Sequence, residues 1–95
     1  MPYIKKDERK CYKAEIKSIV KKLVDREDEN EVYGHLNFII FTIMKKYVAK
    51  KGERYFRYNN LVGMLECCKQ ELYRRLVANY ENQAITKNGD IDDDD

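Results

Sequence analysis

The sequence contains very little of what most catalytic sites require. Its 95 residues include one serine, Ser18, and one histidine, His35, so a Ser-His-Asp arrangement has almost no raw material. No P-loop, dinucleotide-binding fingerprint or H-E-x-x-H motif occurs. Proline and glycine are also scarce, which argues against a disordered, collagen-like or all-β chain. We expect a protein that is not an enzyme and uses no cofactor.

Cysteine is too scarce and too poorly spaced for a zinc site. The three cysteines are an odd number, Cys67 and Cys68 are adjacent, and no C-x-x-C pair exists. Neighbouring residues on a helix point about 100° apart, so these two thiolates do not easily share one metal. The sequence therefore predicts no metal site, and reduced thiols typical of a cytosolic protein.

Long hydrophobic runs are absent as well. The longest apolar stretch, residues 36–44, is interrupted by Asn37 and Thr42 and is too short to cross a bilayer. The N-terminal residues lack the apolar core of a signal peptide. These absences predict a cytoplasmic protein with no membrane partner.

The charged residues are distributed unevenly along the chain. Five of the last six residues are aspartates, and residues 1–89 hold 19 basic and 12 acidic residues, a net charge of +7. We interpret residues 1–89 as one helical domain with affinity for phosphate-bearing partners, and residues 90–95 as a solvated acidic tail. Two alternative roles for the tail are screening of the basic domain and binding of a divalent cation, although it lacks the calcium-loop pattern.

Hydrophobic periodicity predicts an all-α fold, a small three-helix bundle. The three expected helices span residues 7–26, 31–51 and 60–81. The aromatic segment 53–60 has no obvious strand partner and is interpreted as a packed loop, after which Asn59 or Asn60 caps the third helix. Gly63 in the first turn of that helix predicts the close approach of a neighbouring helix.

The predicted helix ends follow from local signals. Asp7 and Glu8 suit the first turn of the first helix, where carboxylates meet the positive end of the helix dipole. Asp28 and Glu31 have the spacing of a capping box, and Gly52 is typical of a helix C-terminus.

The second helix is apolar around most of its circumference, so it needs cover on more than one side. Only two other helices are available, and a chain of this size has a thin core. We therefore predict that homo-oligomerisation completes the bundle, because oligomers usually close by two-fold axes. The expected interface residues are Phe38, Phe41 and Val48.

Arginine and tyrosine concentrate between residues 54 and 80, whereas lysine is the main basic residue elsewhere. Arginine presents a planar fork of donors to phosphate, and tyrosine offers a stacking surface, so together they suit an anionic aromatic ligand. A structural explanation also exists, in which arginines complement a helix dipole and tyrosines cap the core. The predicted ligand-binding residues are Arg54, Tyr55, Arg57, Tyr58, Tyr73, Arg74, Arg75 and Tyr80.

Several sequence strings resemble a known family. These are Met1-Pro2-Tyr3-Ile4, Leu65-Glu66-Cys67, Glu71-Leu72-Tyr73-Arg74-Arg75, Tyr80-Glu81 and Asn88-Gly89-Asp90. They resemble a family of small uncharacterised proteins encoded by phages, prophages and bacteria. The resemblance implies no catalytic residues. It implies a setting among phage accessory genes, many of which oppose host defence, and hence the host cytoplasm.

Three functions are compatible with these observations. The first is an accessory protein whose oligomer sequesters a small nucleotide-like anion through the arginines and tyrosines. The second is a nucleic-acid-binding protein that uses a lysine face on the first helix. The third is an inhibitor that binds a host protein through an exposed patch. The lysines on the predicted nucleic-acid-binding face of the first helix are Lys10, Lys13, Lys17, Lys21 and Lys22.

Overall fold

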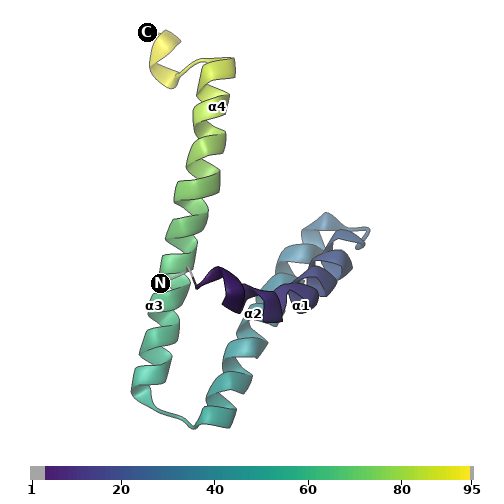
Figure 1. Ribbon diagram of the computed structural model, residues 1–95. Helices are drawn as coiled ribbons and strands as arrows, with labels where there is room; N and C mark the ends of the chain where they lie inside the picture. Colours follow the sequence, from purple (N-terminus) through teal and green to yellow (C-terminus); the bar gives the residue numbers. More distant parts are fainter. Residues whose placement is uncertain (1–3, 95) are drawn as a thin grey trace. The chain divides into compact units, whose positions relative to one another are not determined.

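The structure is a computed structural model that describes residues 4–94. Every regular element among these residues is helical, so the predicted all-α class is confirmed (Figure 1). Residues 1–3 of the N-terminal motif and Asp95 of the acidic tail lie outside the described residues. The elements are α1 (Lys6–Val24), α2 (Glu29–Lys51), α3 (Tyr55–Leu72), the π-helical segment η1 (Tyr73–Val77), α4 (Ala78–Asn88) and the 3-10 helix η2 (Ile91–Asp94).

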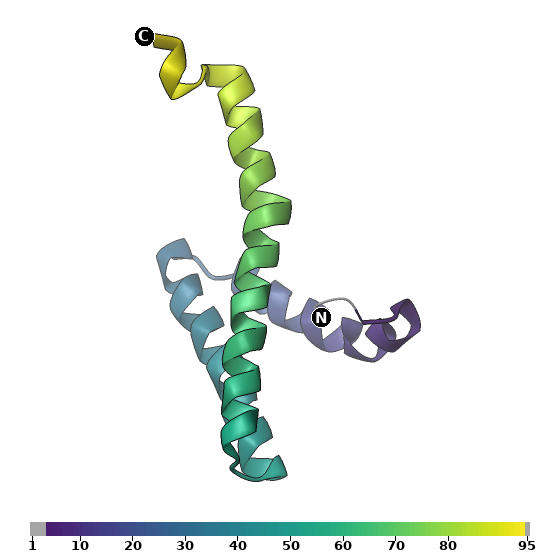
Figure 2. The same ribbon diagram turned by 90° about the vertical axis from the view of Figure 1, so that its left-hand side faces the viewer.

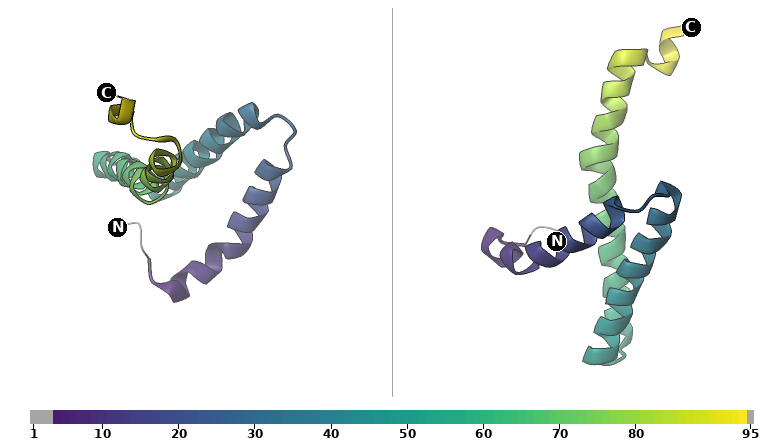
Figure 3. Two further views of the ribbon diagram at one scale, coloured as in Figure 1. Left: turned by 90° about the horizontal axis from the view of Figure 1, so that it is seen from above. Right: turned by 90° about the vertical axis from the view of Figure 1, so that its right-hand side faces the viewer.

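The chain divides into two compact units. The first unit, residues 4–61, contains α1, α2 and the first turns of α3. The second unit, residues 62–94, contains the rest of α3 together with η1, α4 and η2. In the second unit, η1 joins α3 to α4 without a break in the helical ribbon (Figure 2). In the first unit, α1 contacts α2, to which a short turn connects it (Figure 3).

Charge placement explains where α1 begins and ends. Asp7 and Glu8 lie in its first turn, as predicted, and Lys21 and Lys22 lie in its last turn. Both placements oppose the helix dipole. Lys21 Nζ also forms an ion pair with Asp25 Oδ2 at 2.6 Å, one residue beyond the end of the helix. The predicted helix 7–26 is therefore correct to within two residues.

Half of the predicted capping box at the start of α2 is present. The Asp28 carboxylate accepts a hydrogen bond from the backbone N–H of Asn30 at 3.0 Å. The side chain of Glu31 does not return to the cap. Its Oε2 instead accepts from Arg26 Nη2 at 2.7 Å, and this hydrogen bond lowers the pKa of Glu31. Asp28 thus caps the start of α2, whereas Glu31 stabilises the turn between α1 and α2 through its hydrogen bond with Arg26.

Gly52 ends α2, as predicted. Its φ of 108° lies in a region that residues with a side chain rarely adopt, and its N–H donates to the carbonyl of Val48 at 2.8 Å. A glycine at this position therefore lets the chain leave the helix without strain.

The predicted packed loop at residues 53–60 is wrong, because α3 already begins at Tyr55. The Arg54 carbonyl accepts from the N–H of Arg57 at 3.0 Å and so starts the first turn. Asn59 and Asn60 lie inside the helix and do not cap it. The turn needs only residues 52–54, since Gly52 supplies the unusual backbone angle. The aromatic residues that follow can then be helical, because helices tolerate aromatic residues at a small cost in free energy.

The third predicted helix also ends later than expected. Helical structure continues past residue 81 to Asn88, because residues 82–87 contain neither glycine nor proline. Gly89, with φ of 90°, then ends α4, and its N–H donates to the carbonyl of Ile85 at 2.8 Å. The Asn88-Gly89 turn signal therefore marks the true end of the helix.

Very little of the described chain is buried. Val48 is the buried hydrophobic residue of the described part, at 6% exposure, whereas Phe38 and Phe41 on the same helix are 67% and 58% exposed. A Cβ built at Gly63 meets no heavy atom within 4 Å, so the predicted close approach of a helix there is not found. A core this small offers little compensation for the conformational entropy lost on folding.

We expect Gly52→Ala to destabilise the protein by about 1–3 kcal/mol, because alanine at a φ of 108° is strained. Gly34→Ala is the matched control. Its Cβ lies in open space within α2, so alanine should stabilise the protein by about 0.5–1 kcal/mol. Urea unfolding at one protein concentration measures both changes. Equal effects of the two substitutions would contradict the role assigned to Gly52.

We expect the protein to self-associate through the exposed apolar surface of α2, because burial of this surface would add to a small core. Phe41→Glu should convert the assembly to a monomer, because a carboxylate buried in an apolar interface has no partner there. Lys50→Glu, which lies about 180° from Phe41 around the same helix, should leave the assembly intact. Sedimentation velocity at tens of micromolar protein measures both. A stable wild-type monomer would show that this surface does not mediate self-association.

Candidate functional site

The eight predicted ligand-binding residues form two groups, one in each compact unit. Each group is therefore a separate candidate. The first group, in and just after the turn that follows α2, consists of Arg54, Tyr55, Arg57 and Tyr58; the second, on η1 and α4, consists of Tyr73, Arg74, Arg75 and Tyr80.

In the first group, Arg57 closes the end of α2. Its Nη1 donates to the carbonyl oxygen of Gly52 at 2.9 Å, and its guanidinium carbon lies 5.0 Å from the centroid of the Phe56 ring. This contact satisfies a carbonyl at the end of the helix, while the aromatic face stabilises the cation. The structural explanation considered for the arginines therefore fits Arg57.

Tyr58 secures the other side of the same turn. Its hydroxyl donates to Glu53 Oε2 at 2.7 Å. This hydrogen bond raises the pKa of Tyr58 above its ordinary value, since ionisation would place two negative charges side by side. The phenol thus stays protonated throughout the neutral range and continues to donate. Both Arg57 and Tyr58 contribute to the geometry of the turn.

Arg54 and Tyr55 remain available to a ligand. Tyr55 is 83% exposed at the first position of α3, and the Arg54 side chain is also exposed. Tyr55 offers a stacking surface that is not covered by the described residues. These two residues keep the predicted combination of a guanidinium and an aromatic ring.

The second group lies on a backbone irregularity that the sequence analysis did not predict. At the end of η1, the N–H of Ala78 donates to the carbonyl of Tyr73, five residues earlier. In an α-helix the acceptor would be the carbonyl four residues earlier. Single π turns of this kind occur frequently at functional sites. The apolar spacing contains no local signal for the extra residue, so periodicity alone could not reveal it.

Side-chain contacts surround the π turn. Arg74 forms an ion pair with Glu71, and the Asn79 amide donates to the backbone carbonyl of Arg75 at 2.7 Å. The Tyr73 hydroxyl donates a longer hydrogen bond of 3.4 Å to Glu81. Both arginine side chains are exposed. The π turn therefore presents two guanidinium groups on one short segment.

An open depression of about 630 Å³ lies along this segment. Leucines form much of its apolar surface, while arginine and asparagine side chains supply donors. All of the lining residues belong to the helix formed by α3, η1 and α4, so the depression has one wall. The lining residues are Cys68, Glu71, Leu72, Arg74, Arg75, Leu76 and Asn79. Its volume falls in the range of small-molecule sites, roughly 300–1,000 Å³, but its open shape cannot enclose a ligand.

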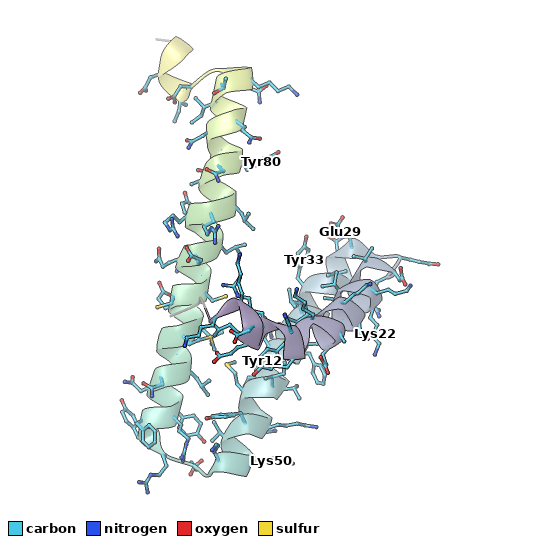
Figure 4. The ribbon with its side chains drawn as sticks, in the orientation of Figure 1. Tyr12, Lys22, Glu29, Tyr33, Lys50 and Tyr80 are labelled. Carbon is cyan, nitrogen blue, oxygen red and sulfur yellow. The ribbon has the colours of Figure 1, made fainter. Side chains whose placement is uncertain are left out.

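Tyr73 and Tyr80 do not line this depression. Tyr80 lies on α4 (Figure 4). Its exposed fraction is 74%. Both tyrosines are nevertheless near the depression along the chain, and Tyr80 follows the lining residue Asn79 directly. The structure therefore combines Arg74 and Arg75 with an apolar surface, while the predicted stacking residues lie close to it in the sequence.

The predicted interface residues differ in how much surface they present. Phe38 and Phe41 are largely exposed, whereas Val48 has little surface left for a partner because it is buried within the chain. The interface stays a prediction that rests chiefly on the two phenylalanines.

The lysine face of α1 is exposed, as a surface for phosphates would need to be. Lys22 is one of its members (Figure 4). Lys21 forms an ion pair with Asp25.

The acidic carboxylates of the tail include Asp90, whose Oδ1 accepts from the N–H of Ile91 at 2.7 Å at the start of η2.

The described residues contain no group of three or more histidine, cysteine or acidic side chains placed to hold a metal ion. The cysteines are exposed, and the thiol of Cys11 donates to the carbonyl of Glu8 at 3.2 Å. Within residues 4–94, no helix combines the length and the apolar character needed to span a bilayer.

Comparison with curated proteins and with solved structures found no match. Residues 1–91 match a protein family described as a domain of unknown function, DUF6899. The match covers all but the last four residues, including every sequence string on which the resemblance rested. The chain therefore belongs to the DUF6899 family.

Proposed function

We propose that this protein is a non-catalytic binding protein that sequesters a small anionic, nucleotide-like ligand at the η1 depression. The observation that carries the proposal is the pair of exposed arginines, Arg74 and Arg75, beside an apolar surface of suitable volume. Guanidinium groups bind phosphate oxygens through paired hydrogen bonds, and the apolar surface suits the face of a base.

The ion pair between Arg74 and Glu71 does not prevent this role. The Arg74 side chain is 70% exposed, and exposed ion pairs contribute little free energy. A phosphate group can therefore replace the Glu71 carboxylate as the partner of Arg74. The leucine side chains Leu72 and Leu76 would lie under the ligand, and Tyr80 would stack at its edge.

Oligomerisation completes the proposed site. The depression has one wall, and a ligand bound with high affinity buries most of its surface. A second copy of the chain can supply the missing wall, which gives the exposed apolar residues a role. The same copy can bring Arg54 and Tyr55, which are exposed and adjacent in the sequence.

Sequestration suits both the chemistry of the chain and its proposed setting. It requires affinity and a fixed stoichiometry but no general base, and the chain has one histidine and one serine. The family resemblance points to phage accessory genes that oppose host defence. In that setting the ligand would be a nucleotide-derived defence signal in the host cytoplasm.

We expect isothermal titration calorimetry against a panel of cyclic and linear nucleotides to find at least one ligand that saturates at a fixed ratio to the subunit. Arg74→Ala combined with Arg75→Ala should weaken its binding at least about tenfold, because each charge-assisted hydrogen bond contributes about 1.5–3 kcal/mol. Lys87→Ala, which removes a positive charge elsewhere on α4, should change the affinity less than about twofold.

Two results would refute the proposal. One is that no nucleotide of the panel binds the wild-type protein. The other is that the double arginine variant changes only the free energy of unfolding and leaves ligand affinity intact, which would make both arginines structural. Steep loss of binding with added salt would favour the rival function, a nucleic-acid surface on α1.

A further inference from the structure

The second half of α2 carries a concentration of positive charge that the proposed function does not use. Between Lys45 and Arg57 the chain has six basic residues and one acidic residue, Glu53. Glu53 already accepts a hydrogen bond from Tyr58. Four of the basic residues lie on α2 itself, namely Lys45, Lys46, Lys50 and Lys51.

These four lysines are exposed and make no ion pair within the described residues. Two other lysines of the chain do form ion pairs, Lys21 with Asp25 and Lys69 with Glu66. No acidic residue occurs between residues 32 and 52. The lysines of α2 therefore have no carboxylate on their own helix within reach. Lys50 marks this end of α2 in Figure 4.

An open depression of about 460 Å³ runs along the face of α2 that carries three of these lysines. Its lining residues follow a helical spacing of three and four, and are Ile43, Lys46, Tyr47, Lys50 and Lys51. Tyr47 is 50% exposed and Ile43 is 60% exposed. The buried Val48 projects toward another side of the helix, since Lys46 and Lys50 are each two positions, about 200°, away from it. An aromatic ring thus lies between basic side chains on an outward face.

We infer that this face binds single-stranded nucleic acid, with the lysines on successive phosphates and Tyr47 stacked on a base. Proteins bind single strands through basic grooves that track the backbone and aromatic side chains that accept the bases. Lys46 and Lys50 lie one helical turn apart on the same face, so they can contact different phosphates of one strand. The inference does not depend on the η1 site, which belongs to the other compact unit.

The shape of the face favours a strand over a free nucleotide. No second wall is proposed for this face, so its depression cannot bury most of a mononucleotide, whereas a strand gains affinity from several phosphate contacts at once. A structural role explains only part of the cluster. Lys50 and Lys51 lie in the last turn and complement the helix dipole, but Lys45 and Lys46 lie earlier in α2.

The test is fluorescence anisotropy of a labelled oligothymidylate about 16 nucleotides long, titrated with the intact protein at about 50 and 200 mM salt. Lys46→Gln combined with Lys50→Gln should weaken binding at least about tenfold at the lower salt. It should also reduce the slope of log affinity against log salt by about 1.4, or about 0.7 for each phosphate that is no longer neutralised. Tyr47→Leu should weaken binding about fivefold or more with the salt slope unchanged.

Lys10→Gln combined with Lys13→Gln is the matched control, because it removes the same charge from α1. It should change affinity less than about twofold, and circular dichroism should show unchanged helix content in all variants. The inference is overturned if the wild-type protein does not bind the oligonucleotide at about 50 mM salt. It is also overturned if the α1 variant loses as much affinity as the α2 variant. Unchanged oligonucleotide binding by the Arg74→Ala and Arg75→Ala double variant would confirm that the two sites are separate.

Discussion

The three-residue turn after α2 depends on a small set of hydrogen bonds around Gly52. Its N–H bonds to the carbonyl of Val48, and its own carbonyl accepts from Arg57. The first bond ends α2 one turn after the buried valine, and the second ties that end to the first turn of α3. A hydrogen bond from the Tyr58 hydroxyl to the Glu53 carboxylate further stabilises the same turn. In a chain with so small a core, backbone geometry of this kind largely determines where α3 begins.

Local signals could predict helix ends but not the length of connections. Asp28, Gly52 and the Asn88-Gly89 pair act through their own backbone or nearest neighbours, so their roles are visible in the sequence. The start of α3 depends instead on a side chain that reaches back five residues, from Arg57 to Gly52, and aromatic content alone suggested a loop. Propensity is a weak guide where a short turn is held by such a contact.

The candidate site could be predicted in composition but not in arrangement. Enrichment of arginine and tyrosine points to residues 54–80, yet it does not distinguish residues that hold the turn from residues that face solvent. Arg57 and Tyr58 are of the first kind, while Arg75 and Tyr80 are exposed. The lysines of α2 are visible in the sequence as a basic run without acidic residues, but lysines are expected on the polar side of any helix. The structure adds the open depression that three of them line together with the half-exposed ring of Tyr47.

The π turn at η1 also sets the rotational phase of α4. In an α-helix, residues four apart drift by about 40° around the axis, so three residues at that spacing would spiral away from one face. A π turn takes up one extra residue and so offsets this drift, which brings Leu72, Leu76 and Tyr80 closer to a common side. A deletion of one residue within Tyr73–Val77 would therefore remove the extra residue, and the restored α-helical turn would leave the side chains of α4 close to their present orientation about the helix axis. If the same residues adopted an α-helical turn without a deletion, every side chain of α4 would instead rotate together, by up to about 100°, and Tyr80 would leave the side on which Leu72 lies.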